Sequence, residues 1–229
     1  MAHDDGAIAV HLEVGKTRNI ALARDWPGWA RGGRDEAAAL RALVAYGPRY
    51  ARVLQATPLT FHAPADIAAL AVVERVEGNA TTDFGAPAIA LASDSRPADP
   101  TELERWQTVM RACWRAFDLA VAAAAGKTLR KGPRGGGREV PKITDHVRDS
   151  ESAYLASLGG AFKPGAAVEP DQAQAQLRAA ILATLAAAVR GEVPALGPRG
   201  KVRWAPRYFV RRLAWHCLDH AWEIEDKIE

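Results

Sequence analysis

The chain has 229 residues, of which 48% are hydrophobic and 25% charged, so it is long enough for one large or two small globular domains. No stretch approaches the roughly 20 apolar residues of a membrane span, and the start, MAHDDGAIAV, lacks the basic flank and apolar run of an export signal. We therefore expect a cytoplasmic protein with no membrane partner, and a formal charge of +3 is too mild to indicate nucleic acid binding.

The chain contains two cysteines, Cys113 and Cys217, and both fall inside predicted helices. They lack the C-x-x-C spacing of a zinc ribbon or a redox dithiol, and two distant cysteines do not form a disulfide framework. We expect both to be small residues of the core.

Residues 1–97 are predicted to form a small mixed α/β domain. A helix is predicted to begin near Asp35, whose carboxylate suits a helix start, and to continue to Leu54, and we expect Pro48 to bend or break it. Short apolar runs bounded by turn residues predict five strands around this helix, the first two joined as a hairpin: 8–14, 19–23, 59–62, 69–77 and 88–92.

The loop that precedes this helix has an aromatic-Pro-Gly pattern, carried by Asp25, Trp26, Pro27, Gly28, Gly32 and Asp35. Together with two strands before it and an Ala-rich helix after it, the first 55 residues resemble a HicB-type antitoxin domain. Any loop from a strand to a helix uses the same residue types. The resemblance implies a small mixed α/β fold rather than a catalytic site.

The character of the sequence changes at SDSRPADP, residues 93–100, where we expect the domain boundary. From there to Glu229 the sequence predicts four amphipathic helices. They begin at a Thr101-x-x-Glu104 capping box, at Pro141, near Pro170 and near Pro206. The second domain, 101–229, is therefore predicted to be an antiparallel four-helix bundle, and the whole chain an α+β protein of two domains.

A glycine-rich basic loop, GKTLRKGPRGGGREV, separates the first two of these helices. Three arginines of this loop are candidates for binding an anionic substrate or the carboxylates of a thiol cofactor: Arg130, Arg134 and Arg138. The ordinary alternative is a solvated connector.

Three histidines are predicted to point into the bundle. His216 and His220 are four residues apart on the apolar stripe of the last helix, so their imidazoles can bind one metal ion. His146 lies on the inward face of the second helix and supplies a third ligand if the two helices are neighbours. Three histidines with an open fourth position are typical of a catalytic zinc-type site. Core histidines held by hydrogen bonds are the alternative.

Two acidic residues lie near the histidine pair on the last helix. Asp219 and Glu223 are candidates for orienting the imidazoles or for acid–base chemistry, and surface ion pairs are the alternative. Cys217 is not a candidate ligand, because it projects about 100° around the helix from His216. The Glu of an H-E-x-x-H protease helix is missing between His216 and His220.

The segments KITDHVRDSESAYL and RRLAWHCLDHAWEIED resemble the DinB-like (DinB/YfiT-type) superfamily of metal-binding four-helix bundles. The resemblance spans residues 101–229 and implies that His146, His216 and His220 bind a divalent ion such as zinc, nickel or iron. Several members use mycothiol, bacillithiol or a related thiol as S-transferases or isomerases. It thus implies a metal-dependent enzyme of thiol-dependent group transfer, or a hydrolase, acting on a small molecule.

A different class of function is also consistent with the sequence. In this alternative the protein is a non-enzymatic regulatory or partner-binding protein, in which the antitoxin-like module docks a partner and the bundle keeps a structural or vestigial metal. Both functions are compatible with a homodimer.

Overall fold

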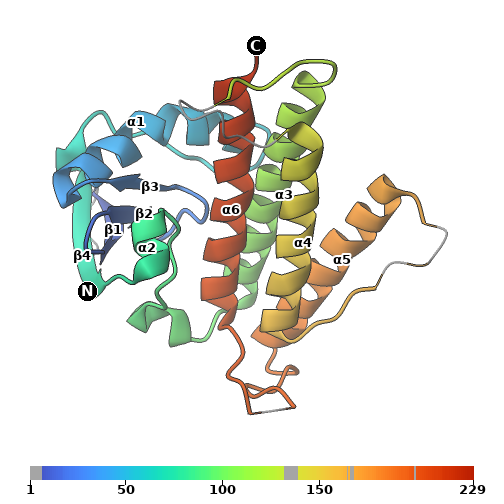
Figure 1. The fold of residues 1–229 in the computed structure, drawn as a ribbon. Helices are drawn as coiled ribbons and strands as arrows, with labels where there is room; N and C mark the ends of the chain where they lie inside the picture. The colour runs from blue at the N-terminus through green and yellow to red at the C-terminus, as the bar shows by residue number, and fades with distance from the viewer. Residues whose placement is uncertain (1–6, 132–138, 164, 166–167, 199) are drawn as a thin grey trace. The chain divides into compact units, whose positions relative to one another are not determined.

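The computed structural model describes residues 7–131, 139–163, 165, 168–198 and 200–229. The chain forms two compact units, Met1–Leu91 and Ala92–Glu229 (Figure 1). Over the described ranges it contains a four-stranded sheet in the first unit and the helices α1 to α6, of which α3 to α6 follow residue 99. The predicted mixed α/β class is confirmed. None of the helices in these ranges is long and apolar enough to span a membrane.

The sheet of the first unit has the strand order β3-β2-β1-β4. β1 and β2 form the predicted antiparallel hairpin, β3 pairs antiparallel with β2, and β4 pairs parallel with β1. A parallel pair needs a crossover, which here contains α1. The strands span Ile8–Val14 (β1), Asn19–Ala23 (β2), Ala30–Gly33 (β3) and Leu70–Glu77 (β4).

Two of the predicted strands, 59–62 and 88–92, are wrong, since neither range forms a strand. At 88–89 the cause is the buried carboxylate of Glu13, which accepts hydrogen bonds from the N–H groups of Ala88 (2.9 Å) and Ile89 (3.1 Å). These amides therefore do not pair with a strand. In the other range, Phe61 packs its ring edge-on against Trp29 at 5.0 Å. The strand β3 was not predicted, because ARGG has no alternation of apolar residues.

The helix α1 spans Glu36–Leu54, with Asp35 as its N-cap as predicted. The Asp35 carboxylate accepts a hydrogen bond from the N–H of Ala38 at 2.7 Å. Pro48 does not break the helix; it lies on the exposed side, where water can reach the backbone carbonyl that its missing N–H leaves unpaired. On the buried side, Trp29 stacks on Tyr50 at 5.9 Å. A short helix, α2, follows at Ala80–Phe84.

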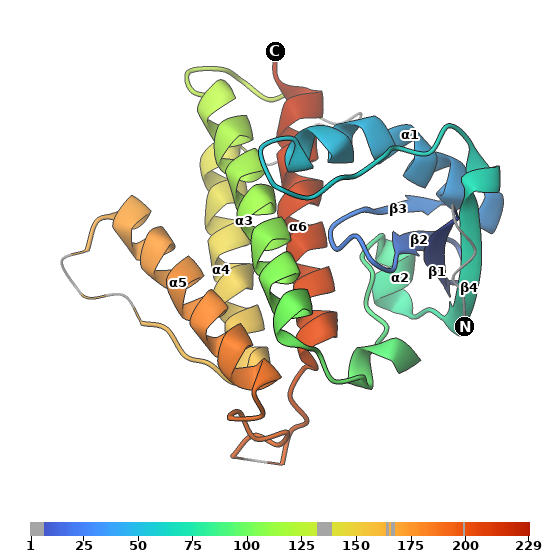
Figure 2. The same ribbon diagram turned by 180° about the vertical axis from the view of Figure 1, so that it is seen from behind.

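The second unit contains the four long helices that the sequence predicts. They span Pro100–Ala123 (α3), Val140–Leu158 (α4), Pro170–Val189 (α5) and Pro206–Lys227 (α6). α6 packs along α3 and α4, whereas α5 contacts mainly α4 and diverges from the other helices toward its start (Figures 1 and 2). The cap of α3 differs from the prediction, because Asp99, not Thr101, accepts the hydrogen bond from the N–H of Glu102 at 2.8 Å.

The segment before α3 belongs to the second unit, which begins at Ala92. Asp94, in a short 3-10 turn at Ala92–Ser95, forms a buried ion pair with Arg211 of α6. The polar stretch expected to mark a boundary at 97 thus holds an anchoring residue of the helical unit.

Candidate metal centre

The helix α6 positions two of the three histidines. It is buried around most of its circumference, and it packs against α3 and α4. His216 is 7% exposed and His220 is 9% exposed, and they lie one turn apart on the side that faces α4. The predicted inward orientation of this pair is confirmed.

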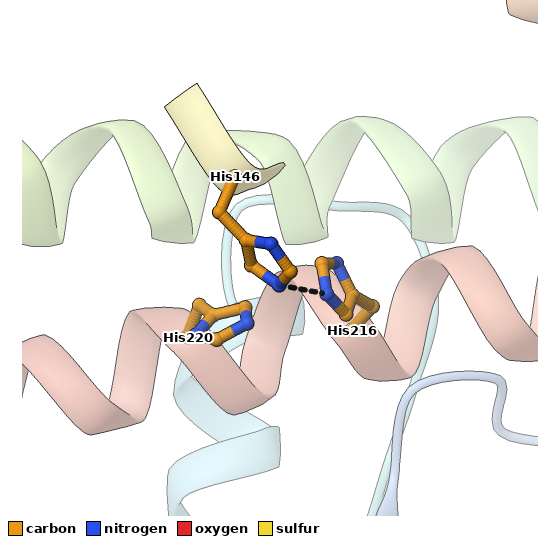
Figure 3. Close-up of side chains that lie close together, drawn as sticks. All are labelled: His146, His216 and His220. Carbon is orange, nitrogen blue, oxygen red and sulfur yellow. Dashed lines mark hydrogen bonds between the residues drawn. The ribbon is translucent and has the colours of Figure 1, made fainter. Parts of the chain in front are cut away.

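The third histidine comes from α4, which begins one residue before Pro141. Ile143 and Val147 are buried on the core side of this helix, and His146 beside them is half-buried. Its Nε2 atom lies 3.1 Å from Nε2 of His216, and its ring centroid lies 5.0 Å from that of His220. Figure 3 shows the three rings turned toward one another. One nitrogen from each ring lies within 4.8 Å of the others.

The distance between the Nε2 atoms of His146 and His216 fits a divalent metal ion. With metal–nitrogen bonds of about 2.0–2.1 Å, two imidazole nitrogens on one ion are separated by roughly 2.8–3.4 Å for bond angles between 90° and tetrahedral. The 3.1 Å between the Nε2 atoms of His146 and His216 lies in this range. Three imidazoles are also a donor set that zinc, nickel and iron accept. A hydrogen bond between the two rings, with one of them donating, has the same length.

The third ring is oriented by a carboxylate. Nδ1 of His220 lies 2.8 Å from Oε2 of Glu223, and Nζ of Lys227 donates to Oε1 of Glu223 at 2.6 Å. The hydrogen bond with His220 is the main cause that lowers the pKa of Glu223 to about 2, so this carboxylate is ionised at neutral pH. A carboxylate on Nδ1 leaves Nε2 of His220 as the ligand atom, as in many metal sites.

The two acidic candidates are therefore placed differently. Glu223 contacts an imidazole of the cluster and also forms the ion pair with Lys227 that was the alternative interpretation. Asp219 is half-buried on the same helix, three residues after His216. Its position alone does not assign it a role in catalysis.

The two cysteines are core residues, as predicted. Both are buried, and Sγ of Cys217 donates to the backbone carbonyl of Cys113 at 3.3 Å. Burial raises the pKa of both thiols, so neither is a thiolate at neutral pH. Cys217 is not a member of the group of possible metal ligands formed by the described residues.

Arg130 contacts the end of α6. Its backbone N–H donates to the carbonyl of Lys227 at 2.7 Å, and its guanidinium donates to the carbonyl of Asp226 at 3.3 Å. The last carbonyls of a helix lack partners within the helix, and a cation satisfies them. This contact favours a structural role over the predicted role in cofactor binding. Arg134 and Arg138, the other two candidates, lie outside the described residues.

A group of aromatic residues beside the histidines was not predicted as part of the site. The ring of Tyr154, on α4, meets His216 edge-on at 5.6 Å, and the ring of Trp204 lies 5.1 Å from Tyr154. Arg212, four residues before His216, lies over the same tyrosine. The sequence signal that could have indicated Arg212 is its spacing, since it lies one helical turn before the predicted ligand His216.

Comparisons of the chain with models of protein families, with curated proteins and with solved structures give no match. What the site can do therefore follows from its own residues. These are three converging imidazoles, a carboxylate that orients one of them, and an aromatic surface that contacts another.

Proposed function

We propose that His146, His216 and His220 hold one divalent metal ion, and that the protein is a metal-dependent enzyme of thiol-dependent group transfer. The observation that carries this proposal is the convergence of the three imidazoles from two helices, with two Nε2 atoms 3.1 Å apart. Glu223 supports it, because a carboxylate on the outer nitrogen of a ligating histidine is a recurring feature of metal sites.

We further propose that α3, α4, α5 and α6 form a DinB-like four-helix bundle. In support, the four helices begin and end close to the predicted residues, and α4 and α6, which carry the two motif segments, pack side by side. In the DinB-like superfamily that the sequence resembles, a histidine early in the second helix and a His-x-x-x-His in the last helix bind the metal. By this proposal zinc, nickel or iron occupies the site.

Three protein ligands leave at least one coordination position for an outside molecule. When bound, such an ion lowers the pKa of a thiol or a water molecule and so supplies a nucleophile at neutral pH. The thiol is not supplied by the protein, since both of its cysteines are buried and their pKa values are raised. The DinB-like resemblance implies a small thiol such as mycothiol or bacillithiol, which is the proposed co-substrate.

A non-enzymatic regulatory protein is the second candidate, and the edge of the sheet favours it. Among the described strands, β4 pairs only with β1, and Val73 on this strand is 49% exposed. An open strand edge is where a strand from a partner can add to a sheet. In this case the first unit docks a protein partner, as its antitoxin-like sequence implies, and the metal is structural.

Metal content tests the first proposal directly. We expect about one divalent ion per chain when the protein is purified without chelator and reloaded. Elemental analysis of His146→Ala, His216→Ala and His220→Ala should show loss of the ion. The matched control is His62→Ala, which changes an exposed histidine of the first unit and should keep the ion. Wild-type protein without stoichiometric metal after reloading would contradict the proposal.

A second experiment separates the two candidates. The metal-loaded protein is assayed with mycothiol, bacillithiol and glutathione, each with a set of electrophiles, and the consumption of thiol is measured. Turnover that the His216→Ala variant lacks supports the enzyme. Bound metal without turnover, together with a tight protein partner that Val73→Asp abolishes, supports the regulatory protein.

A further inference from the structure

The positively charged Arg212 lies on the same face of α6 as His216 and His220. Arg212 precedes His216 by four residues, which is about 6 Å along the helix axis. Its guanidinium carbon lies 4.9 Å from the ring centroid of Trp215 and 5.8 Å from that of Tyr154. Arg212 is half-buried. Contact with two rings restricts its side chain, so less entropy is lost when the guanidinium binds an anion.

Tyr154 connects this arginine to the metal centre. The tyrosine ring meets His216 edge-on at 5.6 Å, with an interplanar angle of 78°, and also lies under Arg212. Tyr154 therefore contacts both the guanidinium of Arg212 and a predicted metal ligand.

Two more aromatic residues extend the surface away from the histidines. The ring of Trp204 lies 5.1 Å from Tyr154, and Tyr208 lies 4.9 Å from Trp204 at an interplanar angle of 90°. All three rings are half-buried. They offer apolar area to the carbon skeleton of a ligand, next to one positive charge.

We propose that Arg212, held against Trp215 and Tyr154, binds a carboxylate of the small molecule whose reacting atom lies at the three histidines. This inference rests on the proposed metal site and names the class of its ligand: a carboxylate-bearing thiol or substrate, with the carboxylate a few bonds from the reacting atom. The guanidinium matches a carboxylate with two parallel N–H···O hydrogen bonds. Trp204 and Tyr208 contact the remainder of the ligand.

The test compares two thiols that differ in charge. Cobalt(II)-loaded protein is titrated with 3-mercaptopropionate and with 2-mercaptoethanol, and binding is followed by the change in visible absorbance. We expect wild type to bind the carboxylate thiol about 10-fold to 100-fold more tightly. Arg212→Met should remove this preference, so that the two thiols bind with similar Kd values. Arg212→Lys should retain part of it.

The matched control is Arg111→Met, which removes the same charge from an exposed position of α3 and should keep the preference. An unchanged far-ultraviolet spectrum and cobalt spectrum show that each variant is folded and loaded. Equal affinities of wild type for the two thiols, or a preference that survives in Arg212→Met, would overturn the inference.

A failure of the metal site gives a different result, since cobalt then produces no spectrum before any thiol is added. In that event the arginine is tested alone, by titrating the metal-free protein with propionate and following the Arg212 side-chain signals by nuclear magnetic resonance. Shifts that saturate, and that Arg111→Met does not alter, support the carboxylate site without the metal. Absence of shifts overturns it.

Discussion

Nδ1 of His220 lies 2.8 Å from Oε2 of Glu223, which is three residues further along α6. Because the Glu223 carboxylate is ionised and is also held by Lys227, it can only accept from this nitrogen. The proton of the neutral imidazole therefore resides on Nδ1, and the lone pair of Nε2 is directed toward the other two histidines. The contact prepares the ring as a ligand.

Glu223→Gln is expected to lower the affinity for a divalent ion by about 10-fold to 100-fold, because a neutral amide oxygen is a weaker acceptor for the His220 N–H. Competition with a chelating indicator measures the affinity. Glu225→Gln, on the exposed side of α6, removes the same charge and should change the affinity by less than about 3-fold. If the two variants bind the metal equally well, the carboxylate does not orient the ligand.

Another carboxylate, the buried Glu151 on α4, yields a prediction on stability. It accepts hydrogen bonds from Nε1 of Trp114 (2.7 Å) and Nε2 of Gln174 (2.6 Å), and burial raises its pKa above the ordinary 4.5. Glu151→Ala leaves both donors without this acceptor and opens a cavity, so it should cost about 2–5 kcal/mol of unfolding free energy. Glu151→Gln, which keeps an acceptor for Trp114, should cost less. Urea denaturation at pH 7 measures both.

The sign of the pH dependence follows from the direction of this shift. The folded state binds the Glu151 proton more tightly than the unfolded state, so the cost of burying the charge falls as the pH decreases through the folded pKa toward 4.5. Wild type should therefore gain stability relative to Glu151→Gln between pH 7 and pH 5. A difference that stays constant, or that shrinks, would show that burial does not control this carboxyl.

The sequence predicts the helical unit well because its signals are local. Pro141 begins α4 and Gly159 ends it, and the four-residue spacing of His216 and His220 places both on one face. Each of these features depends on residues within one or two helical turns. The third ligand, His146, also required that α4 and α6 be neighbours, which the sequence indicates only through the number of helices.

What the sequence misses depends on contacts between distant residues. The run at 88–92 has the pattern of a strand. However, the N–H of Ala88 donates a hydrogen bond to the carboxylate of Glu13, which lies 75 residues before Ala88 in the sequence. Glu223 and Asp219 have similar spacing from the histidines, and the rotation of α6 decides which of them contacts an imidazole. Similarly, the place of Arg212 beside Tyr154 arises from the packing of two helices.

The buried ion pair between Asp94 and Arg211 yields a prediction on the free energy of unfolding. The pair should stabilise the fold more than either charged residue does without its partner. Both side chains are almost fully buried, so removal of one leaves the other charge without a counter-ion in the core. We expect Asp94→Leu and Arg211→Met, each alone, to cost about 3–5 kcal/mol of unfolding free energy. The double variant Asp94→Leu/Arg211→Met, which buries no charge, should be more stable than either single change. Urea denaturation of the four proteins measures the coupling, and additive effects would contradict it.

Two glycines with positive φ provide a matched pair for the end of α4. Gly159 has φ of 111°, and a Cβ there would lie 2.7 Å from Cγ1 of Val193 and 2.8 Å from Cδ of Arg203. Gly126 has φ of 72°, but a Cβ there would meet no described atom within 4 Å. Gly126→Ala should therefore cost only the backbone strain of about 1–2 kcal/mol.

Gly159→Ala adds a clash to that strain and should cost about 2–4 kcal/mol. It should also weaken binding at the aromatic surface, because Arg203 precedes Trp204, whose N–H donates to the carbonyl of Ser157 in the last turn of α4. Urea denaturation gives the two stability changes, and the 3-mercaptopropionate titration gives the affinity. If both glycine variants lose the same stability, the chain after Gly159 moves freely enough to accept a methyl group. If they also bind the thiol equally, the end of α4 does not hold Trp204 in place.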